Sequence, residues 1–155
     1  MDEQAIVRVT WHGPFVWQRG EGPRSGCDEL LRAKGLYQFY GHHVVFGPDS
    51  LIYVGRSKRT LGERMREHQP WVDQESGVTV RRGIIEDRAD LDQTIERVEA
   101  LTIWWHSPPY NSQSIWKRMS GDLWVQNHGD RGSLQPEYTT AWVTQSKRPT
   151  SEPRD

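Results

Sequence analysis

Six side chains in the middle of the chain have types that could catalyse hydrolysis together. In chain order they are Tyr37, Tyr53, Arg64, His68, Glu99 and Asn111. Phosphodiester hydrolysis needs an activated water, charge stabilisation on the phosphate and help for the departing oxygen. A single metal ion with well-placed donors can supply all three. The set therefore has the groups that this reaction needs, provided that folding gathers them in one pocket.

Local charge around these residues is positive although the whole chain is nearly neutral. The formal net charge is -1 and the isoelectric point is about 6.6, which argues against a protein that coats nucleic acid by bulk charge. Between Tyr53 and His68, Glu63 and Glu67 are outnumbered by five basic residues: Arg56, Lys58, Arg59, Arg64 and Arg66. This segment is suited to bind phosphate.

Arg64 and His68 are four residues apart, which places them on one face of a helix. Thr60 and Glu63 have the spacing of a capping box, so we expect a helix from about residue 61 to His68, ended by Pro70. Leu61 and Met65 share the face of Arg64 and His68, so both residues should point toward the protein. The alternative is an ordinary amphipathic helix whose basic residues are merely solvated.

Glu99 falls inside the apolar face of a second expected helix, which starts at Asp90 or Asp92 and runs to Trp105. A carboxylate directed at apolar surroundings is costly unless it is paired or bound to a cation. Glu99 is thus either a metal ligand or the partner of an arginine, and the helix alone does not choose between them.

Asn111 follows a turn that Pro108 and Pro109 impose after this helix. Such a turn can return the amide to the preceding element. An isolated asparagine after two prolines is otherwise a common turn former.

Two glycine-framed tyrosines complete the pattern, in Gly35-Leu36-Tyr37 and Tyr53-Val54-Gly55. Together with Arg64, His68, Glu99 and Asn111 in this order, they resemble the motifs of the GIY-YIG endonuclease family over roughly residues 35 to 115. The chain departs from the family pattern in a longer stretch between the two motifs. The distance from Tyr53 to Arg64 is also one residue longer than is common.

The resemblance implies cleavage of DNA with one divalent cation, Mg²⁺ or Mn²⁺, held by Glu99. It implies that Arg64 contacts the scissile phosphate, that Arg56 and Lys58 support it, and that Asn111 and His68 orient the site. Tyr37 and Tyr53 would lie side by side with their hydroxyls converging on the attacking water. We assign the proton transfer to Tyr37 as a hypothesis, and the sequence does not decide between the two tyrosines.

The same resemblance implies an α+β fold with a small antiparallel sheet of about three strands flanked by helices. Strand patterns at residues 36–40, 44–46, 51–54 and 78–86 suit that sheet, with a turn at 47–50. Residues 1–34 are expected to be an N-terminal extension with short strands broken at Gly13-Pro14. Residues 35–125 form the expected nuclease core. Residues 126–155 form a C-terminal extension whose last ten or so residues we expect to be disordered.

Several protein classes are disfavoured by composition. The single cysteine, Cys27, cannot form an internal disulfide, and no cysteine pair suggests structural zinc. No stretch approaches the ~20 apolar residues of a membrane span, and the first residues lack a signal-peptide pattern. A cytoplasmic protein with no membrane partner is the expectation.

The functional expectation is a restriction or defence endonuclease acting on DNA, and a homodimer would suit cutting both strands of a palindrome. Two alternatives remain. One is a non-catalytic nucleic-acid-binding or assembly module. The other is a repair or recombination nuclease that acts on branched DNA with a partner protein that supplies recognition.

Overall fold

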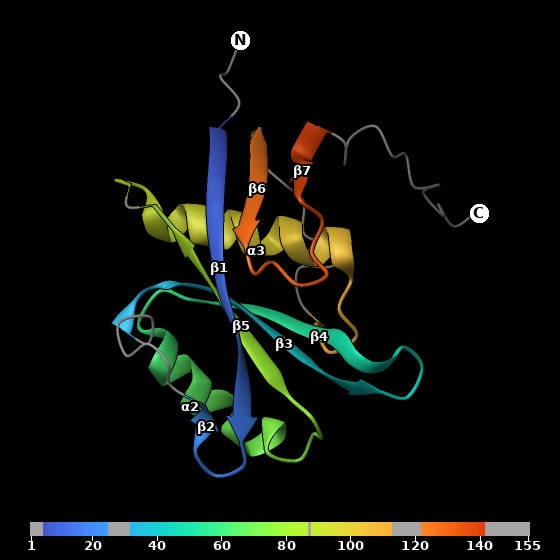
Figure 1. Ribbon diagram of the computed structural model, residues 1–155. Helices are drawn as coiled ribbons and strands as arrows, with labels where there is room; N and C mark the ends of the chain where they lie inside the picture. Colours follow the sequence, from blue (N-terminus) through green and yellow to red (C-terminus); the bar gives the residue numbers. More distant parts are fainter. Residues whose placement is uncertain (1–4, 25–31, 87, 113–121, 142–155) are drawn as a thin grey trace, which may run out of the picture.

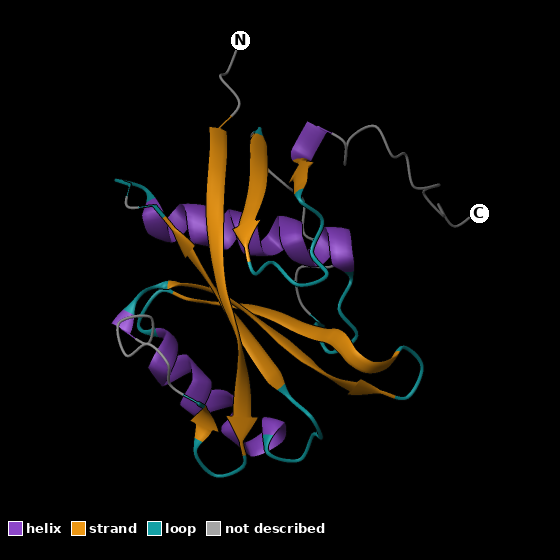
Figure 2. Cartoon of the chain, in the orientation of Figure 1, coloured by secondary structure: helices purple, strands orange, loops and turns teal. Residues whose placement is uncertain are grey.

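The computed structural model describes residues 5–24, 32–86, 88–112 and 122–141 (Figure 1). The expected disordered C-terminal residues and Cys27 lie outside these ranges. The described elements, shown by type in Figure 2, are β1 (Ala5–Gln18), β2 (Gly22–Pro23), β3 (Gly35–His43), β4 (Gly47–Ser57), α2 (Leu61–Val72), β5 (Thr79–Ile85), α3 (Leu91–His106), β6 (Leu123–Gly129) and β7 (Glu137–Thr139).

One curled, mixed sheet organises the described chain. Its strand order is β4-β3-β5-β1-β6-β7, and β2 pairs with the end of β1. All neighbouring strands are antiparallel except β1 and β6, which are parallel. The 14-residue β1 joins the two halves of the sheet, because one part of it pairs with β6 and a later, overlapping part pairs with β5 (Figure 1).

The expected fold class is wrong. The sheet has seven strands of mixed direction and is accompanied by two described helices, in place of a small three-stranded antiparallel sheet flanked by helices. The three expected strands are present and adjacent as β4, β3 and β5. The segments that were expected to be extensions supply β1, β2, β7 and the larger part of β6. They join the sheet because alternate residues of β1, such as Val7, Val9 and Trp11, are buried on one face.

The expected break at Gly13-Pro14 does not end β1. The register with β5 shifts between His12 and Phe15, so Pro14 lies in a bulge, where its missing N–H costs no ladder hydrogen bond. Gly13 has a φ of 137°, which favours glycine, and a Cβ there would lie 2.8 Å from the carbonyl oxygen of Val80.

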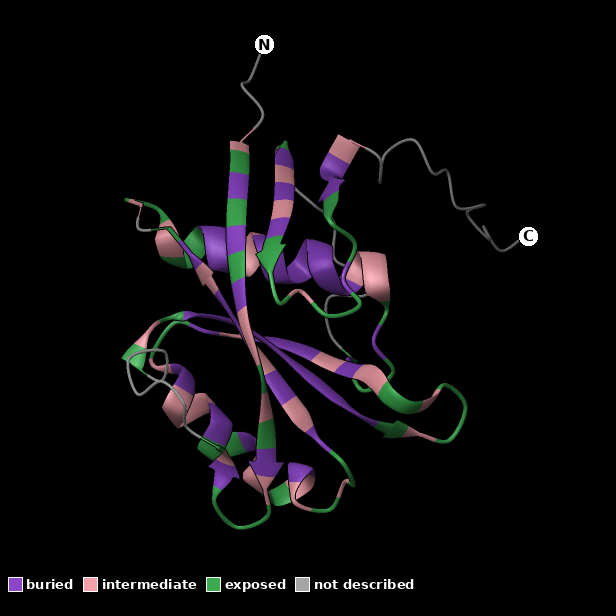
Figure 3. Cartoon of the chain, viewed as in Figure 1, coloured by how far each residue is buried: buried purple, intermediate pink, exposed green. Residues whose placement is uncertain are grey.

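The β3–β4 hairpin turns earlier than its sequence predicts. The turn comprises residues 44–46, and β4 already begins at Gly47, so the turn expected at 47–50 is wrong. Irregular register near Gly41 and His43 absorbs the turn-forming residues into the first part of β4. The turn residues Val44, Val45 and Phe46 are consequently left exposed at the tip (Figure 3).

Local sequence signals predicted where both helices start. Thr60 and Glu63 form the predicted capping box at the start of α2. This helix continues through Pro70 to Val72, beyond the predicted end. A proline near the last turn removes one hydrogen bond, and buried Val72 keeps that turn packed on the core. Asp90 is the N-cap residue of α3, without a side-chain cap hydrogen bond.

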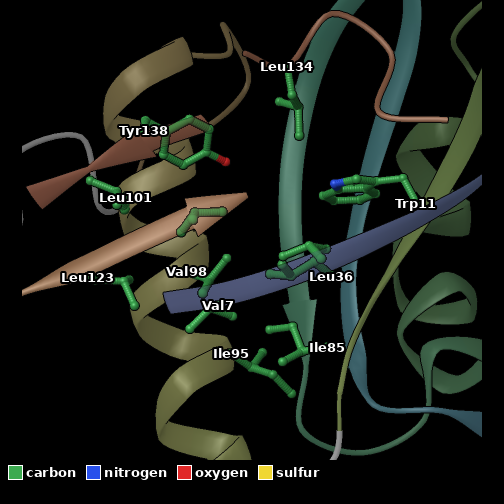
Figure 4. Packing of buried hydrophobic residues seen from close by; sticks show 12 residues of the cluster. Val7, Trp11, Leu36, Ile85, Ile95, Val98, Leu101, Leu123, Leu134 and Tyr138 are labelled. Carbon is green, nitrogen blue, oxygen red and sulfur yellow. The ribbon is translucent and has the colours of Figure 1, made fainter. Parts of the chain in front are cut away.

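Two hydrophobic clusters hold the helices on the sheet. Along β3, Leu36 belongs to the cluster under α3 shown in Figure 4, whereas Tyr37 and Phe39 belong to the cluster under α2. Since successive strand residues point to opposite faces, the two helices pack on β3 from opposite sides. No described helix has the length and apolar character needed to cross a membrane.

Candidate active site beside edge strand β4

A polar cavity of about 380 Å³ opens along β4, which lies at one edge of the sheet. Tyr53 and Arg56 come from β4, Arg64 from α2 and Glu99 from α3, and Asn111 belongs to the segment that follows α3. Side chains alternate along β4, so Tyr53 contacts His68 and Trp71 of α2 whereas Arg56 reaches Glu99 of α3. The edge of the strand therefore brings groups from both faces into one cavity.

Four of the six predicted catalytic residues line this cavity, namely Tyr53, Arg64, Glu99 and Asn111. The predicted phosphate-binding residues Arg56 and Lys58 line it as well. Tyr37 is fully buried and His68 is 8% exposed, and neither lines the cavity. The ring centroids of Tyr37 and Tyr53 are 6.1 Å apart in a stacked arrangement, so the two tyrosines are neighbours as the family resemblance implies.

The cavity lining is positively charged. Arg56, Lys58, Arg59 and Arg64 contribute cations, and Glu99 contributes the carboxylate. Lys58 Nζ lies 3.0 Å from Glu96 Oε2, and Arg64 and Arg59 both pair with Glu67. These four cations face three carboxylates, Glu67, Glu96 and Glu99, so a net positive charge remains at the cavity.

Tyr37 is the centre of a buried hydrogen-bond chain. Trp71 Nε1 donates to His68 Nδ1 at 2.9 Å, and the indole N–H can only donate, so the neutral imidazole carries its proton on Nε2. That nitrogen lies 2.6 Å from Tyr37 Oη and donates to it. Arg64 Nε donates to the same oxygen at 3.2 Å. Both lone pairs of the Tyr37 phenol oxygen are thus occupied.

The position of the Tyr37 ring explains why the second motif ends in glycine at residue 55. A Cβ at residue 55 would lie 2.3 Å from both Oη and Cζ of Tyr37. The Tyr37 ring is buried and its hydroxyl is held by His68 and Arg64, so it has no room to move away. The glycine therefore permits the phenol of the first motif to lie across the backbone of the second.

The surroundings of this hydrogen-bond chain favour the neutral forms of Tyr37 and His68. Burial, reinforced by the neighbouring Tyr53, raises the pKa of Tyr37 above its ordinary value, against the lowering effect of Arg64. Burial, with the positive charge of Arg64, lowers the pKa of His68 to about 4. At neutral pH, Tyr37 is a phenol and His68 is an uncharged imidazole.

The lowered pKa of His68 gives a pH-dependent stability with a definite sign. Between the ordinary value of 6.5 and the folded value of about 4, the unfolded chain binds a proton that the folded chain excludes. Stability is therefore lost as pH falls through this window. We expect unfolding by urea to show a loss between pH 7 and pH 5 that is about 2 kcal/mol larger in the native protein than in His68→Gln.

The matched control is His128→Gln, which removes an exposed histidine from β6. This variant should keep the pH dependence of the native protein. An identical dependence in the native protein and in His68→Gln would contradict the assignment of a neutral, buried imidazole.

Glu99 is directed inward, as its place on the helix predicted, and is 8% exposed. Its Oε1 accepts a hydrogen bond from Arg56 Nη1 at 3.0 Å, so the arginine partner that the sequence left open is present. Burial raises the pKa of Glu99, and the attraction of Arg56 opposes this. The carboxylate is thus held in a partly desolvated place beside one cation.

The residues present are compatible with Mg²⁺ held by a single carboxylate. The described residues contain no group of three or more histidine, cysteine or acidic side chains placed to enclose a metal. Mg²⁺ does not need one, because it keeps several waters and takes substrate phosphate oxygens as ligands. Glu99 Oε2 accepts no hydrogen bond from the described residues, and the cavity has space for waters and a phosphate group.

Asn111 acts on the backbone of β4. Its Oδ1 accepts from Val54 N at 2.9 Å and its Nδ2 donates to Val54 O at 2.8 Å. Tyr110 N also donates to Ile52 O. The amide therefore fixes the segment after α3 against the strand that carries Tyr53.

Three residues of the site were not among the sequence candidates. Trp71 sets the tautomer of His68, and it was missed because the helix was expected to end at Pro70. Its position three residues after His68 was the available signal. Arg59 was counted only as local charge, and Tyr110, which also lines the cavity, was not singled out.

Comparisons with protein-family models, with curated proteins and with solved structures found no match to this chain.

Proposed function

We propose that this protein is a metal-dependent endonuclease that hydrolyses phosphodiester bonds in DNA, with the chemistry of the GIY-YIG endonucleases that its motifs resemble. The observation that carries the proposal is the convergence of Tyr53, Arg64 and Glu99 on one cationic cavity. These three residues come from three separate elements. A phenol, a guanidinium and a partly desolvated carboxylate around a phosphate-sized space form a suitable donor set for this reaction.

The position of each side chain in the cavity indicates its role in the proposed reaction. Arg64 and Arg56 face the cavity and would neutralise charge on the phosphate, with Lys58 in support. Glu99 would hold Mg²⁺ or Mn²⁺, which when bound supplies charge stabilisation for the leaving 3′-oxygen. Asn111 keeps Tyr53 in place through the backbone of Val54.

Burial favours Tyr53 over Tyr37 as the phenol that contacts the attacking water. Tyr53 lines the cavity, whereas Tyr37 is enclosed, has a raised pKa and has both lone pairs engaged. Tyr37 then acts as a positioning residue, because it fixes Arg64 through the hydrogen bond to Nε. This reverses the assignment of proton transfer to Tyr37 that the motif suggested.

The test is cleavage of supercoiled plasmid DNA by the purified protein. We expect nicked and linear products with Mg²⁺ or Mn²⁺ and none with EDTA. In single-turnover assays Tyr53→Phe should lose more of the rate than Tyr37→Phe. Absence of products across plasmid and branched substrates and both metals, with folded protein, would refute the nuclease proposal, and a full rate in Tyr53→Phe would refute the role of Tyr53.

The Arg56–Glu99 ion pair favours a second candidate, a nucleic-acid-binding module without hydrolysis. In that module Arg56 would remain paired with Glu99, and the cavity would bind a phosphate of the nucleic acid without hydrolysing the phosphodiester bond. Salt-sensitive binding of DNA that is unchanged in Glu99→Gln, with no products under any metal condition, would select this candidate.

A further inference from the structure

A row of aromatic rings runs from the tip of the β3–β4 hairpin to the cavity. Phe46 stacks on His43 with centroids 4.9 Å apart, and His43 lies 6.0 Å from Tyr110. Tyr110 lies 6.0 Å from Trp71, which lies 5.8 Å from Tyr53. These five residues, the aromatic row, come from the hairpin, α2 and the segment after α3.

The row is accessible at its outer end and opens into the cavity at its inner end. Phe46 is 66% exposed and Tyr110 is 39% exposed, while both Tyr110 and Tyr53 line the cavity. The hairpin projects from the body of the molecule, and its tip is coloured as exposed in Figure 3. Exposed apolar residues gathered at such a tip are costly in water and commonly mark a binding surface.

The outer ring is held in place before any ligand arrives. His43 Nδ1 accepts hydrogen bonds from the backbone N–H groups of Val45 and Phe46, at 3.2 and 3.3 Å. The imidazole thereby closes the turn and stacks on the Phe46 ring at the same time. Because the backbone that carries the ring is already ordered, less conformational freedom is lost on binding.

Charge differs along the row and indicates which part of a ligand lies where. The inner end adjoins Arg56, Lys58 and Arg64, whereas the Oη of Tyr110, the middle ring of the row, donates to Glu75. A nucleic-acid strand matches this distribution, because its phosphates are drawn to the cationic cavity and its bases have apolar faces that stack on aromatic rings. A lipid surface could offer headgroup phosphates to the cationic end, but its acyl chains have no flat faces for the successive rings to stack on.

We infer that the aromatic row binds unpaired nucleobases next to the phosphate that occupies the cavity. The substrates of this protein are therefore nucleic acids with single-stranded or unstacked nucleotides near the cleavage point. The inference rests on the proposed function for the cavity end. In an intact duplex the faces of the bases are covered by their neighbours, so these rings gain a partner only where the bases are free.

The test is fluorescence anisotropy with three labelled DNA probes in EDTA, so that no hydrolysis occurs. The probes are a single strand, a blunt duplex and a duplex with a single-stranded flap. Phe46→Ala and Phe46→Leu should each weaken binding of the single strand and the flap roughly tenfold, because both remove the stacking ring. Binding of the blunt duplex should change by less than about twofold, since its phosphate contacts are untouched.

The matched control is Val44→Ala, which shortens an even more exposed apolar side chain in the same turn, one that has no ring to stack. This variant should bind all three probes like the native protein. Thermal unfolding of each variant checks that the hairpin change leaves the fold intact. A Tyr110→Leu variant repeats the test at a second ring and should also weaken binding of the single strand.

Three outcomes would overturn the inference: unchanged binding of the single strand in the Phe46 variants, equal losses for the duplex and the single strand, or an equal loss in Val44→Ala. If the native protein cleaves plasmid DNA but the Phe46 variants bind the single strand normally, the role of the aromatic row is rejected and the nuclease proposal stands. If the Phe46 variants selectively lose single-strand binding but the native protein does not cleave DNA, the role of the aromatic row is supported and the nuclease proposal is rejected.

Discussion

Glu99→Gln is expected to reduce metal-dependent DNA cleavage by roughly a thousandfold while leaving DNA binding in EDTA within about twofold of the native protein. The amide has the same shape as the carboxylate and can still accept a hydrogen bond from Arg56 Nη1. It lacks the negative charge that holds the cation. The measurement is the single-turnover rate on plasmid DNA at saturating Mg²⁺, together with binding of a labelled duplex.

Asp92→Asn is the matched control, because it removes one carboxylate from the same helix at an exposed position paired with Lys34. Its cleavage rate should equal that of the native protein. Cleavage by Glu99→Gln at the native rate would exclude Glu99 as the metal ligand. An equal loss in both variants would point to a general effect of charge on α3.

Arg64→Ala is expected to lower the cleavage rate by roughly 100- to 1000-fold, the usual cost of removing one donor that stabilises charge in a transition state. Arg64 has two connected roles. Its Nε holds Tyr37 Oη, and its Nη1 pairs with Glu67 at 2.5 Å beside the cavity. The dependence of DNA affinity on salt should also weaken, by a slope of about one for one lost phosphate contact.

Two further variants separate charge from geometry. Arg66→Ala removes an equal charge from the exposed side of α2 and should cleave at close to the native rate. Arg64→Lys keeps the charge but cannot make both hydrogen bonds in the fixed planar arrangement, so its rate should fall between those of the native protein and Arg64→Ala. A native rate in Arg64→Ala would remove this residue from the site.

Short-range sequence signals predicted much of the local structure correctly. The capping box of Thr60 and Glu63 started α2 where expected, because both hydrogen bonds involve residues within one turn. The apolar periodicity of α3 correctly predicted that Glu99 points inward. Errors arose where a local signal was overridden, as at Pro70 within α2 and Gly13-Pro14 within β1. There, tertiary packing and a bulge absorb residues that usually end an element.

The larger architecture depended on pairings that no local pattern contains. Val7 of β1 pairs with Val125 of β6, and these residues are far apart in the sequence. Each segment alone is compatible with an edge strand, a loose extension or a central strand. Only the burial of both strands against α3 selects the seven-stranded sheet (Figure 4).

By itself, the order and spacing of Tyr37, Tyr53, Arg64 and Glu99 determined which groups are available for chemistry, because residue type and helical or strand period are local properties. The tertiary structure decided which of them meet the cavity. It enclosed Tyr37, left Tyr53 facing the cavity and paired Glu99 with Arg56. The physical reason is that burial, ion pairing and pKa values depend on neighbours from other elements, and the chain acquires those neighbours only when the sheet is complete.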